Sequence, residues 1–345
     1  LSPNGQPIPL IAETGGQNAM VVDSSALAEQ VVADVLASAF DSAGQRCSAL
    51  RLLCVQDDVA DRTVGMLKQA LQEWTLGNPD RLHTDVGPVI DAEARQQIEA
   101  HIERMEAEGQ TVTRVTRGEG LEQGHFVRPA IIELDSVERL TREVFGPVLH
   151  VLRFKRDELD ALVDGINATG YGLTFCVHSR IDETIERMTQ RVHAGNLYVN
   201  RNQIGAVVGV QPFGGMGLSG TGPKAGGPLY LYRLVQASDA HADLDALPTQ
   251  TASKGAEAAA QEGALAALQR TIANGQITGL PAHDRDAALQ ACESAATASR
   301  LGYSELLPGP TGESNRYRLL PRGDVWAMPQ TALGLVHQLA AAYAT

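Results

Sequence analysis

The sequence predicts an α/β protein with a mainly parallel sheet and flanking helices, followed by a smaller α/β domain. Short apolar runs, typical of strands covered on both faces, alternate with segments whose apolar residues recur at helical spacing. The 345 residues, 43% of them hydrophobic and 20% charged, allow two domains with sizeable cores. The composition changes after Val235, which indicates where the first domain ends.

Apolar residues first recur at helical spacing from Leu27, which predicts a helix, and Gly44 provides its C-terminal stop. The apolar run Leu52–Val55 then predicts a buried strand. Two further helices are expected, one over about residues 58–74 and one over Asp91–Gly109, which opens on a capping residue.

The next segment repeats this alternation. Four strands are expected at Phe126–Leu134, Val148–Phe154, Leu173–Val177 and Asn196–Val199. Helical spacing returns over Asp157–Ile166 and Asp182–Val192. Strands that alternate with helices predict crossover connections, and hence parallel pairing.

We expect the first domain to cover residues 1–235 and to end on an apolar strand within 228–235. Residues 236–255 are polar and small, as in a linker. Residues 256–345 are expected to form the second domain, with helices at Ala256–Asn274, Arg285–Arg300 and Thr331–Tyr343 and strands at Tyr317–Leu320 and Asp324–Met328.

Charge and cysteine content exclude several classes of protein. A formal net charge of −13 repels nucleic-acid backbones and anionic lipid. No signal peptide opens the sequence, and no apolar run reaches the ~18 residues of a membrane-spanning helix. The four cysteines form no C-x-x-C pair, so we expect neither a disulfide framework nor a metal site, and a reducing cytoplasm fits best. The chain begins at Leu1 rather than Met, so we expect a fragment of a longer protein.

Cys47 differs from the other cysteines in its surroundings. It lies in a Gly-Gln-Arg-Cys-Ser loop between a helix and a strand, whereas Cys54 and Cys176 lie inside strand runs and Cys292 on an Ala-rich helix. A cytosolic cysteine is most often a small buried hydrophobe, which is our interpretation of those three. Beside Cys47, the Arg46 guanidinium is expected to favour the thiolate that nucleophilic chemistry requires.

Three further loop motifs accompany Cys47. Glu13-Thr-Gly-Gly precedes it, and Glu143-Val-Phe-Gly-Pro and Pro212-Phe-Gly-Gly follow it. Taken singly, each is an ordinary solvated or turn-forming loop. The glycines from Gly215 to Gly220 formally match G-x-G-x-x-G, but this segment lacks a preceding strand and a following helix, so we do not interpret it as a nucleotide loop.

In this order, the four motifs resemble the catalytic half of the aldehyde dehydrogenase superfamily, over about residues 9 to 235. Residues 41–51 and 204–213 resemble, more narrowly, the pyrroline-carboxylate (glutamate semialdehyde) dehydrogenase module of bifunctional proline utilization proteins. Residues 309–315 are similar to the extra C-terminal domain of the longer members, which is dehydrogenase-like and non-catalytic.

The resemblance implies NAD-dependent oxidation of L-glutamate γ-semialdehyde to L-glutamate, the second step of proline catabolism. Cys47 matches the nucleophile, which passes through a thiohemiacetal and a thioester, and Glu13 matches the base that activates water. Glu143 matches the carboxylate that binds the nicotinamide ribose hydroxyls, and Phe145 the ring beside the nicotinamide. A carboxylate suits a diol because it only accepts hydrogen bonds.

The resemblance also implies residues for substrate choice. Ser48 and the backbone of Gly205 and Ala206 match the groups that hold the α-carboxylate and α-amino end of the substrate. Phe213 matches the ring that packs on its aliphatic stem, although an ordinary core role is the alternative for an aromatic residue.

Two other functions stay open: a dehydrogenase for another carboxylated semialdehyde, and a non-catalytic assembly module that oligomerises through the 228–235 strand and the second domain. Retention of Cys47 and Glu13 argues against pure assembly, because packing requires neither. The family's NAD-binding half and the FAD-dependent proline dehydrogenase domain of bifunctional members are expected upstream in the parent chain. The isolated fragment is therefore expected to be inactive.

Overall fold

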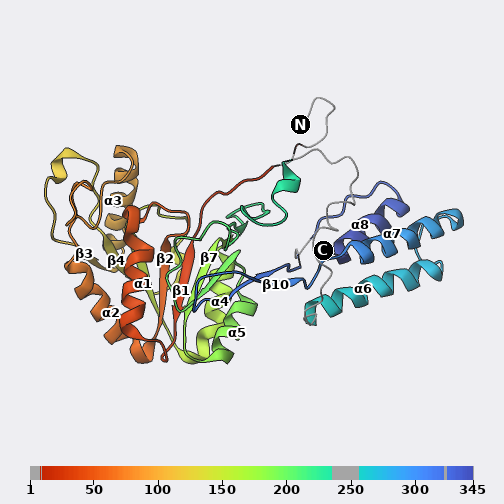
Figure 1. The fold of residues 1–345 in the computed structure, drawn as a ribbon, viewed down its shortest axis with the longest axis horizontal. Helices are drawn as coiled ribbons and strands as arrows, with labels where there is room; N and C mark the ends of the chain where they lie inside the picture. Colours follow the sequence, from red (N-terminus) through yellow and green to blue (C-terminus); the bar gives the residue numbers. More distant parts are fainter. Residues whose placement is uncertain (1–7, 9, 235–255, 322–324, 345) are drawn as a thin grey trace. The chain divides into compact units, whose positions relative to one another are not determined.

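The computed structural model describes residues 8, 10–234, 256–321 and 325–344, and Figure 1 shows their elements. The chain divides into two compact units, the first made of residues 1–207 and 212–227, the second of residues 208–211 and 228–345. The expected linker at 236–255 lies outside the described residues, and the expected domain borders stay a prediction.

A seven-stranded sheet forms the centre of the first unit (Figure 1). Its strands lie in the order β3 (Thr111–Arg114), β4 (Ala130–Leu134), β5 (Val148–Phe154), β2 (Leu50–Gln56), β1 (Asn18–Val22), β7 (Thr174–His178) and β8 (Asn196–Val199). Neighbouring strands are parallel, except for the antiparallel pair β3 and β4. The prediction of a mainly parallel sheet is therefore confirmed.

Helices connect these strands: α1 (Ala28–Phe40), α2 (Asp57–Gln72), α3 (Ala92–Ala107), α4 (Leu159–Ala168) and α5 (Asp182–Arg191). Helices α1 and α2 pack on each other and on β2, whereas α5 packs on β7 (Figure 1). The predicted elements agree with these bounds to within a few residues. As expected, Asp91 caps α3, because its Oδ1 accepts a hydrogen bond of 2.8 Å from the Ala94 N–H.

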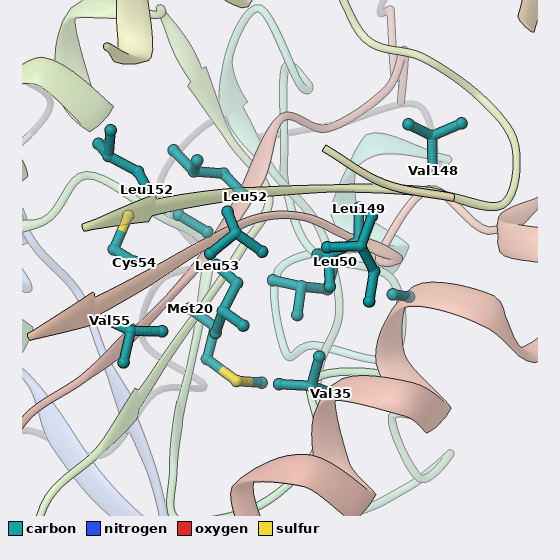
Figure 2. Packing of buried hydrophobic residues seen from close by; sticks show 14 of the residues in the cluster. Met20, Val35, Leu50, Leu52, Leu53, Cys54, Val55, Val148, Leu149 and Leu152 are labelled. Carbon is teal, nitrogen blue, oxygen red and sulfur yellow. The ribbon is translucent and has the colours of Figure 1, made fainter. Parts of the chain in front are cut away.

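The core of this unit lies where β1, β2 and β5 meet α1. Figure 2 shows Met20 of β1 and Val35 of α1 pointing toward one another, with Leu53 of β2 close by. All three side chains are fully buried. Each contributes about 1.5–3 kcal/mol through burial, so this packing fixes the strands that begin at the site.

The predicted strand within 228–235 is wrong over its described residues, 228–234. Residues 228–230 form turns, and Leu231–Arg233 form a 3-10 helix. The Arg233 N–H donates to the Tyr230 carbonyl at 3.1 Å, and the Leu234 N–H donates to the Leu231 carbonyl at 3.0 Å. A strand needs a neighbouring edge to pair with, and no strand in the described part of the chain pairs here, so local bonds satisfy the backbone instead.

The described residues of the second unit form the helices α6 (Ala256–Ala273), α7 (Arg285–Ala298) and α8 (Ala332–Ala344) and the antiparallel strands β10 (Ser304–Leu307) and β11 (Asn315–Arg318). Its core consists of buried side chains from the three helices, namely Leu265, Leu268, Ile272, Ala288, Cys292, Val336 and Ala340. The predicted helices and the strand overlapping β11 are confirmed.

The predicted strand Asp324–Met328 is wrong over its described residues, 325–328, which lie outside any strand. Trp326 is 89% exposed, so this segment has neither a covering layer nor a pairing edge.

The cysteines differ in accessibility, since Cys47 is exposed while Cys54, Cys176 and Cys292 are buried, and all four are free thiols. Across the described residues, no group of three His, Cys, Asp or Glu side chains is placed to hold a metal ion. The helices within the same ranges are all too short or too polar to cross a bilayer.

Candidate active site

Three predicted site residues lie at one edge of the sheet, where its strands begin. Glu13 precedes β1, Cys47 precedes β2 and Glu143 precedes β5. These strands are adjacent and parallel, so the loops that enter them meet at the same edge. Most open α/β sheets bind ligands at the opposite edge, where the strands end. The position of this site therefore differs from the usual position of ligand sites in open α/β folds.

Asn18, the first residue of β1, holds the backbone around Cys47. Its Nδ2 donates to the carbonyl oxygens of Cys47 at 2.7 Å and Ala49 at 2.9 Å. Its Oδ1 accepts from the Thr174 N–H of β7 at 3.1 Å. The start of the sheet thus fixes the position of the cysteine loop. Sequence analysis missed Asn18, whose only signal is a polar residue at the head of an apolar run.

The electrostatic surroundings of Cys47 favour the thiol form. Burial raises the pKa of Cys47, and the negative charges of Glu143 and Glu13 raise it further. The backbone N–H groups of Ser48 and Cys47 act in the opposite direction, because they stabilise a thiolate. The two carboxylates therefore lie near enough to the sulfur to influence its ionisation.

The expectation that Arg46 favours the Cys47 thiolate is wrong. The Arg46 side chain turns back along its own loop, and its Nε donates to Ser42 Oγ at 3.1 Å. The cation whose pKa the Cys47 charge raises is Arg51 of β2. Arg51 was missed as a site residue, although a single charged residue in an apolar strand run is a recognisable signal.

Glu143 is held between two donors. Its Oε1 accepts from Arg51 Nη2 at 3.2 Å and its Oε2 from the Gly16 N–H at 3.0 Å. Burial raises the pKa of Glu143, whereas Arg51 and the Gly16 N–H lower it. A Cβ atom at Gly15 would come within 2.4 Å of Oε2, so this approach requires a glycine. The Phe145 ring lies over the Arg51 guanidinium, at 5.3 Å, and stays 46% exposed.

Glu13 rests on the glycine-rich segment 214–220. Its Oε2 accepts from the Gly215 N–H at 3.0 Å, and a Cβ atom at Gly220 would come within 2.6 Å of Oε1. Burial raises the pKa of Glu13, while the Gly215 N–H and the charge of Lys224 lower it. Within this segment β9 (Met216–Gly217) pairs with β6 (Tyr171–Gly172), and no helix follows directly. The geometry therefore differs from that of a nucleotide loop.

The predicted substrate residues lie in two groups. Ser48 is buried, and its carbonyl oxygen accepts from Gln203 Nε2 at 3.4 Å, which brings the loop of Gly205 and Ala206 against the cysteine loop. Gly205 has φ +72°, a conformation that favours glycine. Phe213 is joined instead to the segment that carries Glu13, because it exchanges backbone hydrogen bonds of 3.0 and 2.8 Å with Ala225.

The aldehyde dehydrogenase family profile matches residues 3–238. The chain belongs to the aldehyde dehydrogenase family. Proteins named bifunctional protein PutA are similar over the whole chain, at 55% identity in Klebsiella aerogenes and 53% in Escherichia coli (strain K12). This chain spans only 26% of the length of either. The 1-pyrroline-5-carboxylate dehydrogenase of Geobacillus kaustophilus is 40% identical over 66% of this chain and 44% of its own length.

Solved structures show the same relationship. A crystal structure of bifunctional proline utilization A is 58% identical, with a TM-score of 0.64, over 67% of this chain and 23% of its own. A Thermus 1-pyrroline-5-carboxylate dehydrogenase with bound NAD is 36% identical, with a TM-score of 0.60, over 65% of this chain and 43% of its own. The family resemblance in the sequence is therefore confirmed.

Proposed function

We propose that this chain supplies the catalytic half of an NAD-dependent dehydrogenase that oxidises L-glutamate γ-semialdehyde, from pyrroline-5-carboxylate, to L-glutamate in proline catabolism. The observation that carries the proposal is the meeting of Cys47, Glu13 and Glu143 at one sheet edge. The similarity to proteins named 1-pyrroline-5-carboxylate dehydrogenase supports the choice of substrate.

Glu143 and Phe145 suit the nicotinamide riboside end of NAD. An ionised carboxylate offers about four acceptor positions, and Arg51 and Gly16 occupy two, so Glu143 keeps capacity for ribose hydroxyls. The exposed face of Phe145 beside it provides a surface for a planar ring. The chemistry that NAD supplies when bound is acceptance of the aldehyde hydrogen as hydride.

Cys47 is the proposed nucleophile. Its thiolate attacks the aldehyde carbon, and the carbonyl oxygen becomes an oxyanion that needs fixed N–H donors. The backbone around Cys47 is held by Asn18, so its N–H is oriented before substrate arrives. Because the resting group is a thiol, it has to lose its proton before the attack, and the exposure of Cys47 lets that proton pass to solvent.

Glu13 is the proposed base for the second half of the reaction. The thioester on Cys47 must be hydrolysed, and a carboxylate that removes a proton from water turns it into an adequate nucleophile. Burial raises the pKa of Glu13 toward the operating pH, which strengthens it as a base.

Recognition of the amino-acid end of the substrate is assigned to Ser48, Gly205 and Ala206, with Phe213 on the aliphatic stem. The contact of Gln203 with Ser48 supports this assignment for the first three, since it places their loops side by side. We also propose a cytoplasmic location, NAD-binding and FAD-dependent domains elsewhere in the parent chain, and assembly into a homo-oligomer.

The test uses the full-length protein and a panel of aldehydes. Wild-type protein should form NADH with glutamate semialdehyde at a kcat/KM on the order of 10²-fold or more above that with an aldehyde lacking the α-carboxylate and α-amino groups. Cys47→Ala should abolish NADH formation, whereas the buried-cysteine variant Cys54→Ala should retain it. Equal activity on both aldehydes would exclude the proposed substrate, and an active Cys47→Ala protein would exclude the proposed nucleophile.

A further inference from the structure

Lys224 lies four residues after the glycine-rich segment 214–220 that supports Glu13. Its ammonium donates to the Gly195 carbonyl oxygen and, at 3.4 Å, to Asn196 Oδ1. Both acceptors are neutral, and in the described part of the chain no carboxylate oxygen forms an ion pair with Nζ. The charge of Glu13 is the one that stabilises this ammonium, whose pKa burial lowers to about 8. A partly buried cation is therefore held close to the proposed base.

Asn196 links Lys224 to the turn on which Glu13 rests. Its Oδ1 accepts from the Gly214 N–H at 3.2 Å as well as from Lys224, and its Nδ2 donates to the Pro212 carbonyl oxygen at 2.9 Å. The next residue, Gly215, donates its N–H to Glu13. The side-chain amide of Asn196 therefore binds both the lysine and the turn.

Glu13 and Lys224 also meet at one glycine. A Cβ atom at Gly214 would lie 3.1 Å from Glu13 Oε1 and 3.1 Å from the Lys224 Cα. Phe213 precedes Gly214 and Ala225 follows Lys224, and the backbone pairing of Phe213 with Ala225 therefore fixes Gly214 and Lys224 relative to each other. A side chain at 214 would therefore crowd both the carboxylate and the lysine backbone, which approach this glycine closely.

We propose that Lys224 is a positioning residue for Glu13: its ammonium keeps the Glu13 carboxylate ionised and, through Asn196, orients the turn that binds it. The proposal rests on the proposed function, in which Glu13 is the base. Among the residues that the structure describes, the titratable groups that face Glu13 are Lys224 and Cys47, and of these two Lys224 supplies positive charge. Removal of that charge should therefore make Glu13 easier to protonate.

The test measures steady-state turnover of the full-length enzyme against pH in wild type, Lys224→Met and Lys224→Arg. Lys224→Met should move the acid limb of the pH–turnover curve to higher pH by about 0.5–1 unit and should lower turnover at neutral pH. The burst of NADH formed in the first turnover should be retained. Lys224→Arg keeps the charge and should keep the limb within about 0.3 unit of wild type. The exposed Lys155→Met is the matched control and should change nothing.

Two outcomes overturn the proposal: an acid limb that stays in place in a folded Lys224→Met protein, or one that moves as far in Lys224→Arg as in Lys224→Met. If Lys224→Met does not fold, Asn196→Ala, which frees the turn from the lysine, should lower turnover while the burst is retained, and unchanged turnover would overturn the proposal. Failure of the proposed function shows separately, because Glu13→Gln would then leave turnover unimpaired.

Discussion

Arg51 and Glu143 form an ion pair of 3.2 Å in which the guanidinium is fully buried and the carboxylate is 13% exposed. Arg51 comes from β2, and Glu143 from the loop that enters β5. A second Arg51 nitrogen, Nη1, donates to the Gly146 carbonyl oxygen at 2.9 Å. The pair therefore joins two adjacent strands at the edge where the site lies, and it orients the carboxylate assigned to the cofactor.

The first prediction concerns this pair. Arg51→Met leaves the partly buried Glu143 with one donor fewer, and loss of one partner of a buried pair costs about 3–5 kcal/mol. The midpoint of thermal unfolding of the full-length protein should therefore fall by several degrees. The exposed pair Arg62 and Glu29 provides the control, since Arg62→Met should cost about 1 kcal/mol or less. Equal shifts for the two arginine variants would refute a structural role for the buried pair.

The second prediction concerns the Cys47 thiol. Iodoacetamide should label Cys47 before the three buried cysteines, at a rate that rises with pH because only the thiolate reacts. Glu143→Gln removes a charge that raises the pKa of Cys47, so the labelling profile should move to lower pH. Glu133→Gln, which breaks the ion pair between Glu133 of β4 and Lys68 of α2, should leave the profile in place. A shift to higher pH in Glu143→Gln would contradict this account of the thiol.

The third prediction arises from a buried histidine pair behind Arg51. The Nε2 atoms of His101 and His150 lie 2.8 Å apart, and His150 Nδ1 lies 2.9 Å from the Arg51 carbonyl oxygen. Arg104 Nη2 lies 3.2 Å from His101 Nδ1. With both rings neutral, Arg104 donates to His101, His101 to His150 and His150 to Arg51.

Burial lowers the pKa of His101 to about 4 and that of His150 to about 3. The unfolded chain, with ordinary histidines near 6.5, binds more protons below that pH, so folding stability should fall from about pH 6.5 toward pH 4. The double variant His101→Gln/His150→Asn keeps hydrogen-bonding groups but cannot be protonated, so its unfolding midpoint should depend less steeply on pH. The exposed His83→Gln should retain the wild-type slope. Parallel slopes in the double variant and wild type would refute this assignment.

Much of the fold follows from local patterns in the sequence. The strands Val148–Phe154 and Asn196–Val199 were predicted at their observed bounds, because short apolar runs between turn residues indicate buried parallel strands. The strand Asn18–Val22 was missed because it has only four apolar residues after a polar one. Thr111–Arg114 was missed because it is partly exposed and is defined by its pairing with β4. The strand within 228–235 was predicted from apolar character alone, which does not supply a pairing partner.

The candidate site shows a similar division. The ordered motifs located Cys47, Glu13 and Glu143, because a loop motif can be identified from its residue types alone. Its position in space does not need to be known. Arg51, Asn18 and Lys224 were missed because their roles depend on residues far away along the chain, such as Thr174 for Asn18 and Glu13 for Lys224. The error about Arg46 has the same origin, since proximity in sequence did not indicate where its side chain points.

The most direct test of the central claim, that Cys47 and Glu13 divide the reaction between them, is stopped-flow measurement of NADH formation by the full-length enzyme carrying Glu13→Gln. The amide cannot accept a proton from water, so steady turnover should fall on the order of 10²–10⁴-fold, while the first turnover still gives a burst of about one NADH per Cys47. A burst and a steady rate reduced by the same factor would contradict the claim, because Glu13 would then act before the thioester forms.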